Sequence, residues 1–257
     1  MSDSVRNIAA IAGKELRSYF GSPVAWVIMA LFAVIFGRFF VVMLDFYLME
    51  SMRSQFGGGA ANVNERVIRP LLSNASVLIL FLLPMLTMRA YAEEKRSGTI
   101  ELLLTSPLKD IEIVLGKFLG AMGLFGGLLA VAAAYIGLLF LYGNPEWRPV
   151  FTGLIGLLLM GGCFVAVGLF LSSLTKNQTV AGAATFVVAL LFWVMDWSAD
   201  TATGNWGEVL RYLSITQHFD DFAKGVLDTK HLVFYLSFIS FGLFLTVRSV
   251  DTDRWRG

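Results

Sequence analysis

The densest group of titratable residues in this sequence is the run Glu93-Glu94-Lys95-Arg96. The residues after it shape the chain. The hydroxyl of Ser97 or Thr99 can cap a short helix, Gly98 permits a sharp reversal, and Pro107 ends the segment. We therefore expect a short helix that is presented sideways, with its charges available for recognition of another molecule.

The same segment, residues 91–110, is more apolar than a solvated loop needs to be. Its apolar side chains follow the charged run and include Ile100, Leu102, Leu103 and Leu104. Such a surface predicts a docking site for another protein. A helix lying against lipid would carry the same pattern, so the residues alone leave both interpretations open.

Two charged residues fall inside or at the end of apolar stretches. Arg38 lies in the outer half of the first stretch, where a charge that faces lipid is costly. We expect it to reach outward to Asp45 or to headgroups, and we favour this structural role over contact with a substrate pathway. Asp196 stands near Trp193 and Trp197 at the end of the fifth stretch, which indicates the membrane interface.

The remaining candidates for chemistry predict no catalytic or metal site. Cys163 is the single cysteine, so neither an intrachain disulfide nor a cysteine metal cluster can form. His218 and His231 are the only histidines and lack a nearby cysteine or ordered carboxylate set, so we expect no metal there. The apolar stretches also lack a serine, cysteine or aspartate pairing typical of a membrane hydrolase.

A nucleotide-binding site is not expected in this chain either. The phosphate-binding motif G-x-x-x-x-G-K-[ST] is missing, because the pairs Gly13-Lys14 and Gly116-Lys117 have Ile8 and Ile111 at the position of its first glycine. We therefore expect the chain to be no enzyme by itself and to bind no cofactor. ATP and magnesium would bind to a partner subunit.

The composition indicates a membrane protein. Of the 257 residues, 56% are hydrophobic and only 15% are charged, and the mean hydropathy is +0.70. A soluble core of this size cannot hide so much apolar surface, so a lipid bilayer must be the solvent. The formal net charge of +1 gives no basis for binding nucleic acid.

Six stretches are long and apolar enough to cross the hydrocarbon layer as helices, which takes roughly 20 residues. They run over 23–44, 71–90, 115–142, 150–174, 179–196 and 232–247. We expect an all-α membrane protein with six transmembrane helices.

The basic residues near the ends of the spans set the orientation. More of them lie on the side of the N-terminus, so we expect both termini in the cytoplasm, and we expect Lys117 and Arg89 to extend toward that interface. Residues 1–22 have the pattern of an interfacial helix. Residues 197–231 would lie outside and form two short amphipathic helices, which either rest on the outer leaflet or dip back into the membrane.

Small residues predict a packing face on the third span. Gly116, Gly120, Gly123 and Gly127 recur at spacings of three and four, which lets another helix approach closely. The partner helix can belong to the same chain or to a second copy. Pro84 in the second span would free a backbone carbonyl and bend the helix, as a hinge or as a static feature.

Several segments together resemble a known family. Residues 93–104 followed by Leu115-Gly116-Lys117-Phe118 resemble the core of ABC transporter type 2 permeases. Residues 14–20, 172–178 and 218–226 resemble the gliding-motility-type branch of these permeases. The similarity spans nearly the whole chain in matching order.

The resemblance implies a single permease domain over 1–257 that pairs with a second permease subunit, identical or different, and with cytoplasmic ABC ATPase subunits. It implies an elbow helix that includes Lys14, Glu15 and Arg17. It also implies a coupling helix seated on the ATPase, with contacts from these residues: Glu93, Glu94, Arg96, Gly98, Thr99, Glu101 and Leu103.

The function that follows is that of the membrane-spanning subunit of an ATP-driven exporter in a bacterial plasma (inner) membrane. An envelope accessory protein can accompany it. The alternative is a membrane scaffold that transports nothing and relays ATPase motion to an envelope partner. Apolar spans without a distinctive polar cluster assign no substrate.

Overall fold

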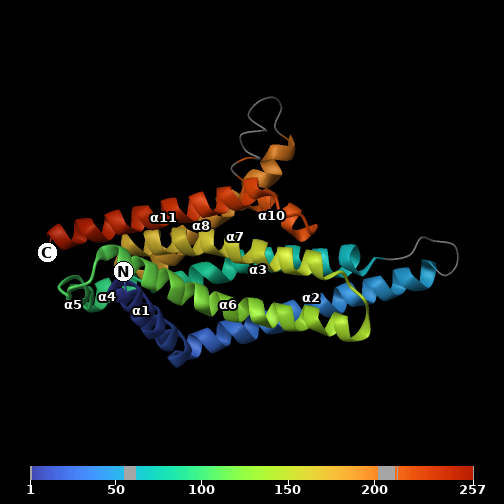
Figure 1. Ribbon diagram of the computed structural model, residues 1–257, viewed down its shortest axis with the longest axis horizontal. Coiled ribbons are helices and arrows are strands. Elements are labelled where there is room, and N and C mark those ends of the chain that lie inside the picture. The colour runs from blue at the N-terminus through green and yellow to red at the C-terminus, as the bar shows by residue number, and fades with distance from the viewer. Residues whose placement is uncertain (1, 55–61, 202–211, 213, 257) are drawn as a thin grey trace.

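The computed structural model describes residues 2–54, 62–201, 212 and 214–256, and the described residues form helices and connecting turns without a strand. Figure 1 shows an elongated bundle in which α4, α5 and both termini lie at the same end. In chain order the elements are α1 (Ser2–Gly21), α2 (Pro23–Ser54), the π-helix η1 (Asn64–Ile68), α3 (Arg69–Thr87), α4 (Ala92–Ser97), α5 (Ile100–Leu104), α6 (Asp110–Tyr142), α7 (Trp147–Ser173), α8 (Gln178–Thr201), α10 (Ile215–Ala223) and α11 (Thr229–Arg256).

The prediction of six membrane-spanning helices is confirmed. Among the described residues, six helices are long and apolar enough to cross a membrane. They cover Pro23–Arg53, Asn64–Ser97, Asp110–Tyr142, Trp147–Ser173, Gln178–Met195 and Thr229–Arg254. Several are longer than predicted, because apolarity marks only the part in lipid, whereas backbone hydrogen bonds continue the helix into water.

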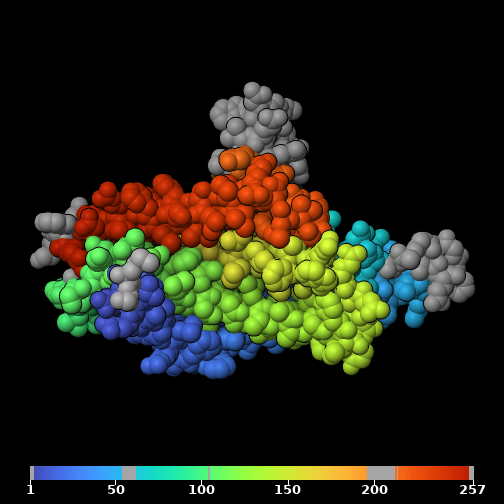
Figure 2. All heavy atoms as spheres, in the orientation of Figure 1, coloured from blue at the N-terminus to red at the C-terminus, as the bar shows by residue number. Residues whose placement is uncertain are grey.

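The centre of the bundle is formed by α3 and α7. In the most apolar part of the span that contains α3, 56% of the residues are buried, and the corresponding share in α7 is 61%. In α2 and in α8 it is only 17%. The latter helices turn most of their surface outward, as lipid-facing helices do. Figure 2 shows α11 along one edge of the body and α1 with the first part of α2 along the opposite edge.

The glycine face of α6 packs against α1 of the same chain, which answers the question that the sequence leaves open. A Cβ added to Gly116 would lie 2.6 Å from the Cβ of Ile11, and one added to Gly120 would lie 2.6 Å from the Cβ of Glu15. Such distances are too short for two carbon atoms, so only glycine permits this approach.

Helix α10 packs beside the first turns of α7. The Thr152 hydroxyl donates a hydrogen bond of 2.7 Å to the Phe222 carbonyl oxygen, and a Cβ on Gly156 would lie 2.7 Å from that of Phe222. The second of the two short helices expected in 197–231 is therefore present and held against a span. The first, expected around Trp206 to Leu213, falls outside the described residues.

Two glycines on α6 provide a matched test of the packing between α1 and α6. We expect Gly120→Ala to lower the free energy of unfolding by about 1 to 3 kcal/mol, as overpacking does. A Cβ added to Gly126 would meet no described atom within 4 Å beyond the backbone of its own helix, so Gly126→Ala should leave stability unchanged or raise it by up to about 1 kcal/mol. Thermal unfolding in detergent compares the two, and equal midpoints would contradict the packing.

Candidate functional site

The charged segment of the sequence folds as two short helices, α4 and α5, which Gly98 and Thr99 separate. Gly98 has φ of 74°, a left-handed conformation that suits glycine and lets α5 leave in a new direction. The predicted hydroxyl cap is wrong, since Thr99 makes no side-chain cap on α5. The Ser97 hydroxyl donates instead to the Glu93 carbonyl oxygen at 2.9 Å, because that group lies one turn back on the same helix.

The start of α4 is fixed by a buried serine of α7. The Ser172 Oγ accepts hydrogen bonds of 3.1 Å from the backbone N–H groups of Tyr91 and Ala92. The same hydroxyl donates to the Met88 carbonyl oxygen at 3.0 Å. One side chain thus satisfies three backbone groups that the turn between α3 and α4 leaves open.

The end of α11 holds the same segment from another direction. Lys95 forms an ion pair of 2.5 Å with Asp253 and also donates to the Ser173 carbonyl oxygen. Arg254 donates to the Leu108 carbonyl oxygen at 3.1 Å and pairs with Asp110 at 3.1 Å. The chain before and after α5 is therefore anchored to α7 and α11.

Lys117 of α6 lies at the centre of these contacts. Its side chain is only 2% exposed, and its ammonium group donates to Glu15 at 3.0 Å, to Glu94 at 2.8 Å and to the Ala90 carbonyl oxygen at 2.8 Å. The same nitrogen lies 5.0 Å from the centre of the Tyr91 ring. All three protons have an acceptor, which is what a buried ammonium needs. The expectation that Lys117 extends to the interface is wrong, because two carboxylates from neighbouring elements hold it inside.

The two carboxylates of this network are residues that the family resemblance assigns to the elbow and coupling helices. Glu15 and Glu94 point toward Lys117, and exposed Lys14 lies 3.9 Å and 3.8 Å from them. Sequence reasoning did not foresee the role of Lys117. The feature of the sequence that could have indicated this role is a lysine in the middle of a glycine face. A helix that packs closely against such a face can bring a carboxylate within reach of the lysine.

The other residues predicted for the coupling helix differ in how far their side chains are exposed. Leu103 is partly buried against the core of the bundle, whereas Leu102 is 74% exposed. The outward surface of α4 and α5, together with exposed Arg17 of α1, consists of the following residues: Glu93, Arg96, Gly98, Thr99, Glu101 and Leu102. This surface of mixed charge with one prominent leucine is suited to contact with another protein.

The two predicted charges in the spans lie away from this segment. Arg38 is exposed on α2, and it makes no hydrogen bond or ion pair within the part of the chain that the structure describes. The predicted contact with Asp45 is absent there. The helix α8 includes Asp196, whose side chain falls outside the described part.

The two histidines, far apart from the charged segment, contact each other beside α10. Their Nδ1 atoms are 2.5 Å apart, and the outer nitrogens meet the Tyr212 carbonyl oxygen and Asp221, each at 2.9 Å. Burial lowers the pKa of His218. Neutral His218 then donates from Nε2 to the Tyr212 carbonyl oxygen and accepts at Nδ1. His231 is therefore the donor in the hydrogen bond between the two rings. Within the described ranges no group of three or more histidine, cysteine or acidic side chains could hold a metal.

An ion pair also connects α3 to α10 near the histidines. Arg69 donates to Asp220 at 2.9 Å, and Lys224 lies 2.7 Å from the same carboxylate. Burial alone would raise the pKa of Asp220, but the hydrogen bonds from Lys224 and Arg69 outweigh it and lower the pKa. The carboxylate therefore stays charged at neutral pH and helps to keep α10 against the bundle.

These features define a class: a multi-pass helical membrane protein with a rigidly anchored polar segment at the end that carries both termini. The family model described as ABC-2 family transporter protein matches residues 9–247. The chain therefore belongs to the ABC-2 transporter family, as the resemblance of the sequence predicts. A search of curated proteins finds no match.

Removal of the central cation tests the network. Lys117→Met leaves Glu15 and Glu94 without their buried partner, and we expect the free energy of unfolding to fall by about 3 to 5 kcal/mol. The triple change Glu15→Gln, Glu94→Gln and Lys117→Met should recover most of the loss, because no buried charge then remains unpaired and Lys14, the other cation beside these carboxylates, is exposed. Unfolding in detergent, with the exposed Lys176→Met as control, measures both. A Lys117→Met protein as stable as the parent would refute the network.

Proposed function

We propose that this chain is the membrane-spanning subunit of an ATP-binding-cassette exporter and that its α4–α5 segment receives the motion of a separate ATPase. Membership of the ABC-2 transporter family supports an ABC ATPase as partner in general. ATP and magnesium are assigned to that partner. The observation that supports this role for the segment is that α4 and α5 present an exposed surface while the chain that carries them is tightly anchored to neighbouring helices.

The anchoring is what a lever requires. Ser172 fixes the start of α4 to α7, Lys117 fixes it to α6 and α1, and Asp253 and Arg254 fix the segment to α11. A force on the outward surface of α4 and α5 is then passed to three spans rather than absorbed by a loose loop. Coupling between distant sites needs such physically connected elements.

The orientation of the chain follows from this role. The ATPase would be cytoplasmic, so the end with α4, α5 and both termini faces the cytoplasm of a bacterial cell and the protein lies in its inner membrane. Helix α1 would serve as the elbow helix at the inner interface. Two permease subunits, identical or different, would form the pathway. Arg38, a charge within a span that has no partner among the described residues, is a candidate for its lining.

The resemblance of residues 14–20, 172–178 and 218–226 to the gliding-motility-type branch favours a second candidate function. In it the chain transports nothing and relays ATPase motion to an accessory protein of the envelope. The α10 region would be the contact, because the described helix there is held against α7 and α3 by Thr152 and Arg69. ATP-dependent flux from proteoliposomes separates an exporter from a relay.

An exposed leucine tests the docking surface. Leu102→Ser removes an apolar side chain that makes little contact within the chain, so the fold should be unaffected. If Leu102 is buried in the ATPase, its loss should weaken association about tenfold or more, since a buried leucine contributes about 1.5 to 3 kcal/mol. Co-purification of the ATPase with the permease, and the stimulation of its ATP hydrolysis, are the measurements.

Leu174 provides the control, because it is 58% exposed at the same end of the bundle but outside α4 and α5. Leu174→Ser should retain the ATPase at the parental level. Equal retention by both variants would show that α5 is not the docking surface. Equal loss by both would show that a wider apolar face is responsible.

A further inference from the structure

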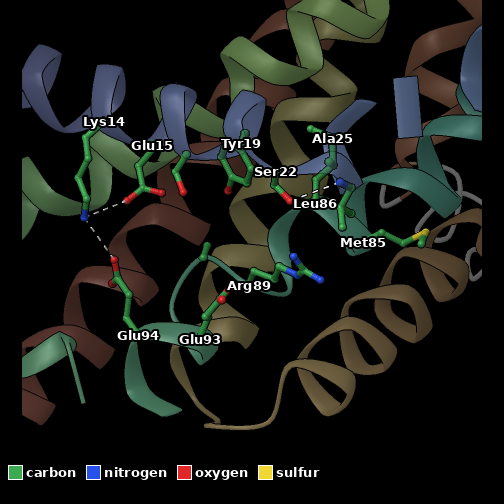
Figure 3. A pocket seen from close by; sticks show the side chains of 13 residues that line it. Lys14, Glu15, Tyr19, Ser22, Ala25, Met85, Leu86, Arg89, Glu93 and Glu94 are labelled. Carbon is green, nitrogen blue, oxygen red and sulfur yellow. Dashed lines mark hydrogen bonds and ion pairs between the residues drawn. The ribbon is translucent and has the colours of Figure 1, made fainter. Parts of the chain in front are cut away.

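A cleft of about 240 Å³ opens between α1, the start of α2 and the α3–α4 turn. Figure 3 shows its two ends. Lys14, Glu15 and Glu94 lie at one end, Met85, Leu86 and Ala25 lie at the other, and Arg89 extends between them. The cleft therefore changes from charged to apolar along its length.

The charges around the cleft are not all paired. Its lining includes two cations, Lys14 and Arg89, and three carboxylates, Glu15, Glu93 and Glu94. Lys117 does not line the cleft but contacts two of these carboxylates. Glu15 and Glu94 are both within 4 Å of Lys117 and of Lys14. The side chains of Arg89 and Glu93 are the two that form no hydrogen bond or ion pair with another described residue.

Two buried polar atoms at the cleft also have no hydrogen-bond partner among the described residues. The Arg89 Nε and the Glu94 Oε2 are both buried without a hydrogen bond. A buried donor or acceptor that loses water without gaining a partner is costly and rare. The donor needs an anion, and the acceptor needs a cation or a hydrogen-bond donor. One ligand that carries both groups would satisfy both atoms.

The apolar end limits the ligand to one that stays in the membrane. Val24 and Ala25 begin the first span, and Met85 and Leu86 lie in the last turns of α3. Met85 is 45% exposed, so an apolar wall leads from the charged end toward the hydrocarbon. A soluble ion would not need this wall, whereas an acyl chain would.

We infer that this cleft binds the headgroup of a zwitterionic phospholipid with a primary amine, phosphatidylethanolamine. The phosphate accepts hydrogen bonds from the Arg89 guanidinium, which binds phosphate oxygens in a fixed, planar geometry. The ammonium donates to Glu93 and to the free oxygen of Glu94. The glycerol and the first carbons of the acyl chains lie along Met85 and Leu86.

Three further hydroxyl groups suit this ligand. The hydroxyls of Ser18 and Ser22 line the cleft on the side of α1. Burial and the neighbouring carboxylates raise the pKa of Tyr19, so its hydroxyl stays protonated and can donate to a phosphate. An anionic headgroup such as that of phosphatidylglycerol would bring a net negative charge close to three carboxylates and would offer the Glu94 oxygen a hydroxyl rather than a cation. The carboxylates on the lining thus favour the zwitterion over phosphatidylglycerol.

The test uses the full-length chain, purified and depleted of lipid, and native mass spectrometry. It is titrated separately with phosphatidylethanolamine, phosphatidylglycerol, phosphatidylcholine and inorganic phosphate. We expect one phosphatidylethanolamine per chain to bind at least about tenfold more tightly than either other lipid, because only it supplies a primary ammonium. Inorganic phosphate should not displace it.

Variants assign the two charged contacts. Arg89→Gln should weaken phosphatidylethanolamine about tenfold or more, the loss of one charge-assisted contact to phosphate. Glu93→Gln should retain phospholipid but reduce the preference for phosphatidylethanolamine over phosphatidylglycerol. Lys176→Gln, an exposed cation at the same end of the bundle and outside the cleft, should bind as the parent does. Size-exclusion profiles identical to the parent show that each variant is folded.

Four results would overturn the inference. Equal binding of phosphatidylethanolamine by Arg89→Gln and by the parent would show that Arg89 does not contact the phosphate. Equal binding of all three lipids by the parent would leave only an unspecific apolar groove. Displacement by inorganic phosphate would make the site one for a free anion. Loss of ATPase association in Arg89→Gln with lipid binding intact would assign the cleft to the partner protein instead.

Discussion

The ammonium group of Lys117 sits where four parts of the chain meet. Its three protons point to acceptors on α1, on the turn after α3 and on α4, while its stem belongs to α6. Two carboxylates could not be brought together in this poorly hydrated place without a cation between them. This one group therefore joins α1 and α4 to each other and to the spans, and the surface that α4 and α5 offer to other molecules is built on that junction.

The glycine face of α6 makes that arrangement geometrically possible. Gly116 and Gly120 flank Lys117 in the sequence, and each accepts a side chain of α1 at a distance that no larger residue would allow. This approach brings Glu15 within reach of the lysine. The small residues set the distance between the helices, and the ion pairs then determine which residues of α1 face α6.

The sequence predicts the membrane fold well because its signal is local. Each of the six spans is a long apolar run, and the glycine reversal at Gly98 follows from a single residue type. The contacts of Glu15, Glu94 and Lys117 are different, because they join residues that are far apart in the chain and share no pattern. The hydroxyl cap predicted at Ser97 or Thr99 failed for a different, local reason, because the Ser97 hydroxyl donates to a carbonyl oxygen of its own helix. A local pattern thus predicts the short helix, but it does not determine which nearby partner a hydroxyl takes.

The site was predictable only in outline. The exposed charges at Glu93, Arg96 and Glu101 match the expectation of an outward surface. The anchoring of that surface by Ser172, Asp253 and Arg254 was not foreseen, since a serine and two charges near helix ends are common in any membrane protein. Only their arrangement in space distinguishes them, and three-dimensional proximity has no marker in one sequence.

The length of α2 has a consequence for the surrounding lipid. Its span of 31 residues is about 46 Å long at 1.5 Å per residue, whereas the hydrocarbon layer measures about 30 Å. Phe46, Met49 and Met52, near its far end, are exposed apolar side chains. Asp45 and Glu50 share these last turns, so the end of the helix extends beyond the hydrocarbon layer and its exposed apolar side chains lie at the level of the headgroups. The lipids around this end of the protein therefore meet both charged and apolar side chains above their acyl chains.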